Sequence, residues 1–275
     1  MRRVRVLALI AMVCLGSAAA LRAQVVAANT FDAVVIRPAK PDETGRGWDQ
    51  NENTTKISNF TLVDLVLRAY GLKARSQVLD TPEWTEKDRY DITAKVTPDE
   101  MKRMEALPQQ EGVEAYRATL RSMLAERFGL KVELSKRSMP RFALTRVSAT
   151  SMGPGLLPTP AGPDGRPVGG TNTSRNSSSS KATFTVSGVA MSDLADRLSG
   201  MNEVGQRVVV DKTGLPGFFQ FKLEYAPDNG MGVSPEATMP GLMDAMREQL
   251  GLKLVKDEGD VPVVIVSAAS KPELD

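Results

Sequence analysis

The sequence predicts an α+β protein of two repeated lobes, each with a mainly antiparallel sheet covered by helices. Residues 120–134 and 242–256 carry this prediction, because both read as an amphipathic helix, a glycine and then a strand. Five residue types recur in them at one constant offset: Leu120/Leu242, Glu126/Glu248, Gly129/Gly251, Leu130/Leu252 and Lys131/Lys253. Residues 62–71 match 191–200 in the same way. One continuous sheet made from both halves is the alternative arrangement.

Helices in the first lobe are indicated by their caps and apolar spacing. Thr61 and Asp64 form a capping box, and Gly71 stands where that helix should end. Thr97 and Pro98 open a second, short helix. Apolar residues from 113 to 128 keep helical spacing over four turns and predict the longest helix.

Strands are predicted by alternating or β-branched runs. In the first lobe they cover residues 31–37, 54–60 and 90–96, followed by 130–134 and 141–147, which we expect to be joined by a turn at 138–140. In the second lobe they cover 182–189, 208–210 and 219–225, and a closing hairpin joins 252–255 to 261–266 across a turn at 257–260.

Four segments divide the chain. Residues 1–23 are expected to be a signal peptide, 24–148 the first lobe, 149–181 a flexible linker and 182–275 the second lobe. The linker is predicted from composition, because 21 of its 33 residues are Gly, Pro, Ser or Thr. Such a segment has few apolar side chains to bury against the entropy of ordering it.

The N-terminus has the three parts of a secretory signal peptide. Arg2, Arg3 and Arg5 precede an apolar run over residues 6–15, and small residues follow at 18–20. We therefore expect export to the periplasm or the extracellular space, with no stable membrane insertion after cleavage. The single cysteine, Cys14, lies in this leader, so the mature chain has no disulfide.

Composition argues against several chemistries. The sequence has no histidine, which excludes a Ser-His-Asp triad and an H-E-x-x-H zinc site. No glycine-rich phosphate loop occurs, and we expect neither a cofactor nor a metal. Of the 35 basic residues four lie in the leader, which leaves 31 against 33 acidic residues. Nucleic acid is therefore not an expected partner.

Few residues qualify as site residues. Glu83, Asp88 and Asp91 stand close to Trp84 and are the weak catalytic alternative, although aspartates at a strand start commonly bind turn amides. Trp48 and Trp84 are possible contact residues, Trp48 either covering the edge of the core or stacking on a ligand. Met231 and Met239, in a predicted loop, are possible adaptable contacts.

Several stretches together resemble the "soil-associated protein" family, an exported domain of unknown function from soil bacteria. They are residues 31–38, 59–62, 69–72, 82–84, 88–91, 124–131, 211–215 and 249–253. The resemblance implies export and no assigned activity, and fusion of some relatives to membrane sensor peptidases implies a sensing role. This chain departs from the pattern at residues 266–270, where relatives often have an Asp-His pair. Residues 183–223 also resemble, more weakly, the short N-terminal domains of secretins and TonB-dependent receptors.

Three functions follow as hypotheses. The leading one is an exported, non-catalytic interaction or sensing module, whose edge strands take up an unknown protein, peptide or glycan. The second is a carboxylate-based hydrolase of polysaccharide or cell wall. The third is a small-ligand binding protein that uses the groove between the lobes.

Overall fold

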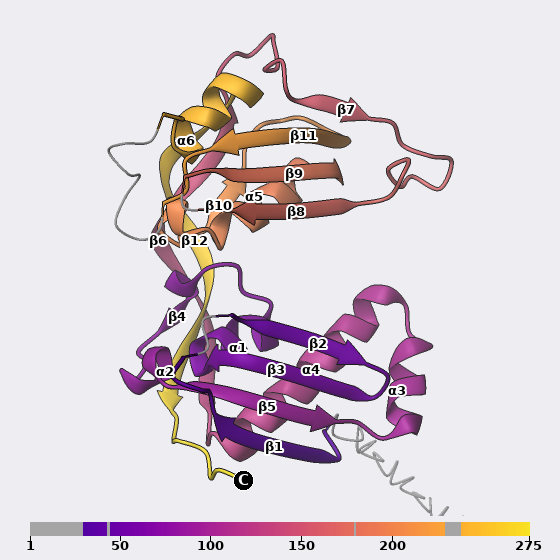
Figure 1. The fold of residues 1–275 in the computed structure, drawn as a ribbon, viewed down its shortest axis with the longest axis vertical. Coiled ribbons are helices and arrows are strands. Elements are labelled where there is room, and N and C mark those ends of the chain that lie inside the picture. Colours follow the sequence, from indigo (N-terminus) through magenta and orange to yellow (C-terminus); the bar gives the residue numbers. More distant parts are fainter. Residues whose placement is uncertain (1–29, 43–44, 179, 229–237) are drawn as a thin grey trace, which may run out of the picture.

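The computed structural model describes residues 30–42, 45–178, 180–228 and 238–275. Within them the chain forms 12 strands in three sheets together with helices, which confirms the α+β prediction. Figure 1 shows two lobes, one above the other, joined by two long strands. The predicted signal peptide and Met231 lie outside the described residues.

The first lobe, at the bottom of Figure 1, has a four-stranded sheet in the order β1-β5-β3-β2. All its strand pairs are antiparallel. Its elements are β1 (Ala33–Pro38), β2 (Gly47–Asn51), β3 (Thr54–Thr61), β5 (Arg89–Lys95), α1 (Leu62–Tyr70), α2 (Trp84–Lys87), α3 (Pro98–Glu105) and α4 (Gln109–Arg127).

Helix α1 begins and ends where the sequence predicts. The Oγ1 atom of Thr61 accepts a hydrogen bond from the backbone N–H of Asp64, and the Asp64 carboxylate accepts one from the N–H of Thr61. At the other end Gly71 has a φ of 63°, a left-handed conformation that glycine adopts without strain. The inner face of α1 is buried against α4 and the sheet.

The second lobe has a sheet in the order β7-β11-β9-β8, again antiparallel throughout. Its elements are β7 (Leu157–Thr159), β8 (Asn172–Ser177), β9 (Ala182–Val189), α5 (Met191–Ser199), the 3₁₀ turn η2 (Asn202–Val204), β11 (Phe218–Tyr225), α6 (Leu242–Ala245) and the π-helical turn η3 (Met246–Leu250). Its sheet order matches that of the first lobe position by position. A repeat as the origin of both lobes remains a prediction.

Two strands connect the lobes, β6 (Lys131–Arg146) and β12 (Leu252–Ala268). They pair antiparallel along almost their whole length, and Figure 1 shows them running from one lobe into the other. In the first lobe β12 also pairs in parallel with β4 (Val78–Leu79), which follows the 3₁₀ turn η1 (Arg75–Gln77). In the second lobe β6 also pairs in parallel with β10 (Val209–Asp211).

The two turns predicted within these strands, at 138–140 and 257–260, are wrong. Both segments are extended and face each other, with Pro140 opposite Glu258. Among the described residues each strand has only the other as partner between the lobes, so the missing N–H of a proline is tolerated there. Arg141 also binds Asp257 across the pair, with 2.8 Å between Nε and Oδ2. Long-range pairing therefore overrides the local turn signals.

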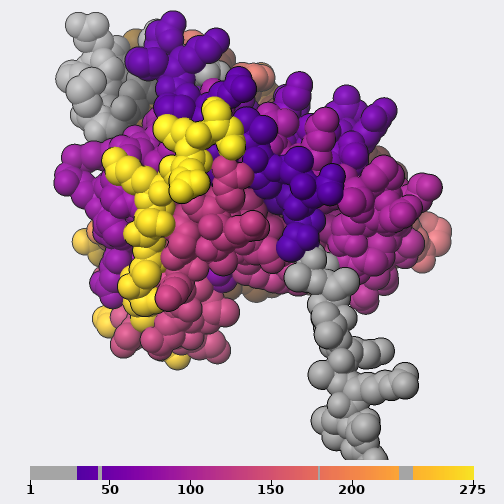
Figure 2. Space-filling model, turned by 90° about the horizontal axis from the view of Figure 1, so that it is seen from below, coloured from indigo at the N-terminus to yellow at the C-terminus, as the bar shows by residue number. Residues whose placement is uncertain are grey.

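Each long strand contributes to both hydrophobic cores. In the first lobe Val264 and Val266 are part of the core and Val132 packs against it, whereas Leu144 and Leu252 pack in the core of the second lobe. The chain passes from the first lobe to the second through β6 and returns through β12. The described C-terminal residues therefore belong to the first lobe, and Figure 2 shows them in yellow lying across its surface.

Residues 149–181 are more ordered than a flexible linker would be. They contain β7 and β8, and Leu156 is buried in the second core. The N–H groups of Gly153 and Gly155 donate to the carbonyls of Leu250 and Gln249, at 3.0 and 2.8 Å. A Cβ at Gly153 would overlap the backbone of Leu250. Here glycine permits close backbone approach, which composition alone does not distinguish from flexibility.

Candidate ligand-binding site

An aromatic cluster lies between the edge of the first sheet and helix α4. It consists of Trp48 on β2, Phe60 at the end of β3, and Tyr116 on α4. The ring centroid of Trp48 is 5.5 Å from that of Phe60 and 6.5 Å from that of Tyr116. Tilted and edge-on contacts at these distances are favourable for aromatic rings. The indole of Trp48 is thereby held in one position, although it is only half-buried.

A pocket of about 530 Å³ opens beside this cluster. Side chains two residues apart on a strand share a face, so Trp48 and Gln50 lie on the same side of β2. Val113, Tyr116 and Leu120 meet on one face of α4 through their spacing of three and four residues. The pocket is lined by Trp48, Gln50, Glu52, Asn53, Thr55, Arg68, Val96, Met101, Met104, Glu105, Gly112, Val113, Tyr116, Arg117 and Leu120.

Arg68, on the last turn of α1, covers one face of the indole. Its Cζ atom is 4.7 Å from the Trp48 ring centroid, within the range of a cation–π interaction. Among the described residues no carboxylate forms an ion pair with Arg68, whereas Arg117, also in the pocket, pairs with Glu114 at 3.6 Å. The pKa of Arg68 is lowered, first because burial disfavours its charged form and also because Arg46 repels it, while Tyr116 acts in the opposite direction.

Tyr116 places a hydroxyl in the pocket. Its oxygen is 2.9 Å from Oγ1 of Thr55, which is buried on β3. Burial raises the pKa of Tyr116, and its hydrogen bonds to Thr55 and Gln50 and the charge of Arg68 oppose this shift. The hydroxyl therefore stays neutral at physiological pH, where it can donate or accept a hydrogen bond.

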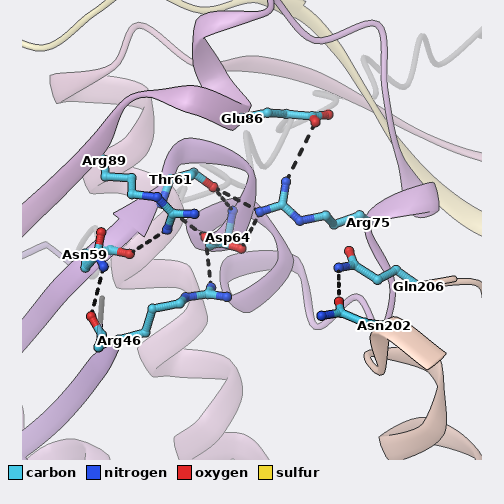
Figure 3. A network of polar contacts seen from close by, with 10 residues as sticks. Arg46, Asn59, Thr61, Asp64, Arg75, Glu86, Arg89, Asn202 and Gln206 are labelled. Atoms are coloured by element: carbon cyan, nitrogen blue, oxygen red, sulfur yellow. Dashed lines mark hydrogen bonds and ion pairs between the residues drawn. The ribbon is translucent and has the colours of Figure 1, made fainter. Parts of the chain in front are cut away.

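A buried carboxylate holds a second arginine near the cluster. The Asp64 side chain is only 3% exposed and forms ion pairs with Arg46 at 2.8 Å and Arg75 at 2.9 Å, as Figure 3 shows. Burial alone would raise the pKa of Asp64. The hydrogen bond from the backbone of Thr61 and the charges of the two arginines together outweigh burial, so the pKa of Asp64 is lowered. Asp64 thus stays ionised and fixes both cations.

Two arginines lie over neighbouring rings of the cluster, Arg46 over Phe60 and Arg68 over Trp48. The Cζ of Arg46 lies 4.7 Å from the centroid of Phe60, which itself contacts Trp48. Both arginines also line a second, more open hollow of about 430 Å³. The arrangement is cationic on one side of Trp48 and mainly apolar on the other. A cationic edge beside an apolar surface is complementary to an amphipathic molecule.

The three predicted carboxylates have other partners. Asp91 Oδ1 accepts from the backbone N–H of Asn59 on the paired strand β3 at 2.9 Å, rather than from an amide of its own turn. Asp88 pairs with Lys271 at 2.7 Å, and the exposed Glu83 pairs with Lys87. None of the three lines the pocket beside Trp48. These contacts lend a carboxylate-based hydrolase no support.

Of the predicted contact residues, Trp48 lines the pocket and Trp84 does not. The ring of Trp84 packs against the first core, with Nζ of Lys271 6.0 Å from its centroid. Met239 is half-buried in the second lobe, before α6. In the part of the chain that the structure describes, no group of three or more Cys, Asp or Glu side chains is placed to hold a metal ion. No helix described there is long and apolar enough to cross a membrane.

The sequence did not identify Arg68, Tyr116 or Arg46 as site residues. Arg68 and Tyr116 lie on helices where an arginine or a tyrosine at the edge of the apolar face is ordinary. They meet Trp48 only after α1 and α4 pack against the sheet. The one sequence feature that indicated the site was Trp48, because a large aromatic ring in a polar segment needs other side chains to cover it.

A groove does occur between the lobes, as the third hypothesis expected. It has a volume of about 660 Å³ and lies between the η1–β4 segment and η2. Its walls include the charged residues Arg75 and Glu86, and Asn202 and Gln206, which Figure 3 shows beside Arg75. This groove is more polar than the pocket beside Trp48 and has no aromatic residue in its lining.

Comparison with known proteins gives one match. Residues 63–269 match the family described as "Protein of unknown function (DUF3738)". No curated protein and no solved structure matches the chain. The match agrees with the expected domain of unknown function, whereas the soil association and the secretin-like or TonB-like similarity remain predictions.

Proposed function

The chain belongs to the DUF3738 family of proteins of unknown function, and we propose that it is an exported, non-catalytic binding module for a small amphipathic ligand. The ligand occupies the pocket beside Trp48 in the first lobe. The proposal keeps the leading hypothesis of an interaction or sensing module. It also keeps small-ligand binding, but in the pocket beside Trp48 and not in the groove between the lobes.

One observation carries the proposal: an apolar pocket has a rigid aromatic wall and few polar groups. Its volume of about 530 Å³ falls in the range of roughly 300–1,000 Å³ typical of small-molecule sites. Leu120, Met104 and Val96 supply apolar surface that is already buried. Tyr116 and Arg68 supply directional polar contacts. A preformed site of this kind costs little ordering entropy when a ligand enters.

The absence of a catalytic constellation in the sequence supports binding rather than turnover. The chain has no histidine, and its one cysteine is in the predicted leader. Of the carboxylates close to Trp84 in the sequence, Asp91 accepts a hydrogen bond from strand β3, and Glu83 and Asp88 form ion pairs. Export is proposed from residues 1–23 and is tested by locating the protein in cell fractions. Recovery of the full-length, uncleaved chain in the cytoplasm would contradict export.

Dye binding tests the pocket directly. N-phenyl-1-naphthylamine, an uncharged apolar dye, should become fluorescent with wild-type protein, and Val113→Trp should weaken its binding about tenfold or more by filling the pocket. Val113 is 46% exposed, so the substitution leaves the core intact. Val255→Trp is the matched control, because Val255 is 42% exposed and lies outside the pocket. Equal weakening by both variants, or no binding to wild type, rules out the proposed site.

A second candidate function is uptake of an extended peptide at β2. Within the described residues β2 pairs only with β3, which leaves its other edge without a strand partner. A peptide that adds a strand there would protect backbone N–H groups of β2 from hydrogen exchange. Titration with a peptide library followed by exchange measurements distinguishes the two functions. Protection confined to the backbone amides of α4, with none at residues 47–51, contradicts strand addition.

A further inference from the structure

We infer that the ligand bound beside Trp48 carries a carboxylate, which Arg68 binds through its guanidinium while the rest of the molecule lies in the apolar pocket. The inference rests on the function proposed above and specifies its ligand class as small aromatic or aliphatic carboxylic acids. It does not depend on which acid the protein meets.

The first support is the unpaired charge of Arg68. Arginines near it have carboxylate partners within the described chain: Arg46 and Arg75 pair with Asp64, and Arg117 pairs with Glu114. Arg68 forms no such ion pair there and lies over the π face of Trp48, although Asp193 and Asp196 line a neighbouring hollow with it. An arginine at the mouth of an apolar pocket that forms no ion pair within the described chain can accept an incoming anion.

The second support is the place of the guanidinium at the pocket. The Cζ atom of Arg68 lies 4.7 Å from the Trp48 ring centroid and Arg68 lines the pocket together with Trp48, so its N–H groups are within reach of a ligand held there. A carboxylate can then accept two parallel hydrogen bonds without displacing the Trp48 contact. The apolar part of such a ligand can then enter the pocket beside Trp48. Arg68 and Trp48 line both this pocket and the second hollow.

The third support is the polarity of the pocket. Its acidic lining residues, Glu52 and Glu105, lie at the β2–β3 turn and at the end of α3. Glu52 is four residues along the chain from Trp48, which corresponds to roughly 13 Å along a strand. An acid group is thus attracted to one end and repelled from the other.

The repulsion between Arg46 and Arg68 adds to this preference. It contributes to the lowered pKa of Arg68. A bound carboxylate would relieve this repulsion and return the pKa of Arg68 toward its ordinary value.

The experiment compares two molecules of the same shape and different charge, 2-naphthoate and 2-naphthamide. Each displaces the uncharged dye from the full chain, and its affinity is read from the loss of fluorescence. For wild type we expect naphthoate to bind about tenfold more tightly than naphthamide, the size expected for charge-assisted hydrogen bonds. This ratio should fall as salt is added, because Arg68 is partly exposed.

Arg68→Gln should bring the ratio close to one while dye binding persists, and Arg68→Lys should retain part of it. Arg117→Gln is the matched control, because it removes a pocket arginine whose charge is already paired. A wild-type ratio of one or less overturns the inference without any variant, as does a ratio that Arg68→Gln leaves unchanged. In both cases dye binding still supports the pocket, whereas failure of the dye itself to bind refutes the pocket and the carboxylate together.

Discussion

The two lobes have the same sheet order but differ in what covers the edge strand. In the first lobe β2 faces the 19-residue helix α4, with α3 beside it, and a pocket remains between them. In the second lobe the corresponding stretch is the four-residue α6 followed by η3. The edge strand β8 there contributes Arg175, whose Nε donates to the hydroxyl of the fully buried Tyr225 at 2.7 Å.

This difference indicates that one architecture was used in two ways. The second lobe fills the region near its edge strand with a polar cluster, in which Arg175 also pairs with the buried side chain of Glu203. The first lobe leaves comparable space open and surrounds it with aromatic and apolar side chains. A long helix, rather than a different sheet, creates the candidate site. Five predictions test how independent and how different the lobes are.

The largest effect is expected from Leu198→Ala in the second core. Leu198 is fully buried, so the cavity should lower the free energy of unfolding by about 2–5 kcal/mol. Both tryptophans lie in the first lobe. Because β6 and β12 belong to both cores, the tryptophan fluorescence transition in denaturant should shift together with the circular dichroism transition. Unchanged fluorescence with shifted dichroism would indicate that the lobes unfold independently.

The next effect compares Asp64 with its counterpart Asp193 on α5. Asp64→Asn leaves two arginines facing a neutral amide at a buried position, and should cost about 3 kcal/mol. Asp193→Asn changes an exposed residue and should stay within about 0.5 kcal/mol. Chemical denaturation of both variants measures the two costs. Similar costs would mean that the two positions are equivalent in energy as well as in sequence.

The same residue predicts a dependence of stability on pH. The folded pKa of Asp64 lies below its ordinary value of 3.8, so its stabilising contribution is complete above that value. The contribution is lost as the pH falls through the folded pKa. Wild type should therefore lose more stability than Asp64→Asn below about pH 4. Parallel pH profiles of the two proteins would contradict this account.

A smaller effect is expected at the start of residues 149–181. Gly153→Ala places a methyl group against the backbone at the end of η3 and should destabilise the protein by about 1–3 kcal/mol. Gly45→Ala, where a Cβ meets nothing within 4 Å, is the control. Thermal melting of both variants distinguishes a docked segment from a flexible one. Equal melting temperatures would favour the flexible linker expected from composition.

The smallest effect concerns the helix caps. Helix α1 has the capping residue Thr61, whereas α5 has Ala190 at the same position, with no side-chain hydrogen bond. Ala190→Ser should therefore stabilise the protein by about 0.5–1 kcal/mol, measured by chemical denaturation. Ala190→Gly, which adds no hydroxyl, is the comparison. If serine gives no more stability than glycine, the N-terminus of α5 does not need a side-chain cap.

The parts of the fold that sequence predicted are those with local causes. Helix α1 was identified through Thr61, Asp64 and Gly71, all within its own ten residues. The strand breaks at 138–140 and 257–260 were predicted wrongly because their cause is not local: pairing between β6 and β12 joins residues more than a hundred positions apart. Proline and glycine indicate a turn only where no partner strand is present.

Of the three residues at the centre of the candidate site, Trp48, Arg68 and Tyr116, only Trp48 was predicted from the sequence. Trp48 attracted attention as a tryptophan in a polar stretch. Arg68 and Tyr116 did not, because arginine and tyrosine on amphipathic helices usually need no explanation. Their role comes from a meeting of β2, α1 and α4, and no spacing in the sequence encodes it. The carboxylates that stood out in the sequence, Asp88 and Asp91, are bound to their own surroundings.

The long antiparallel pair has a consequence for how the molecule can be divided. The chain leaves the first lobe along β6 and re-enters it along β12, so the whole second lobe is topologically an insertion between two strands of a hairpin. A protease cut within residues 149–181 would give two fragments. Neither would contain a complete lobe, because the N-terminal fragment would include β6, which contributes to the second core, and the C-terminal fragment would include β12, which contributes to the first. Joining Pro140 to Glu258, which already face each other, by a tight turn would instead excise the second lobe and leave both strand ends of the first in register.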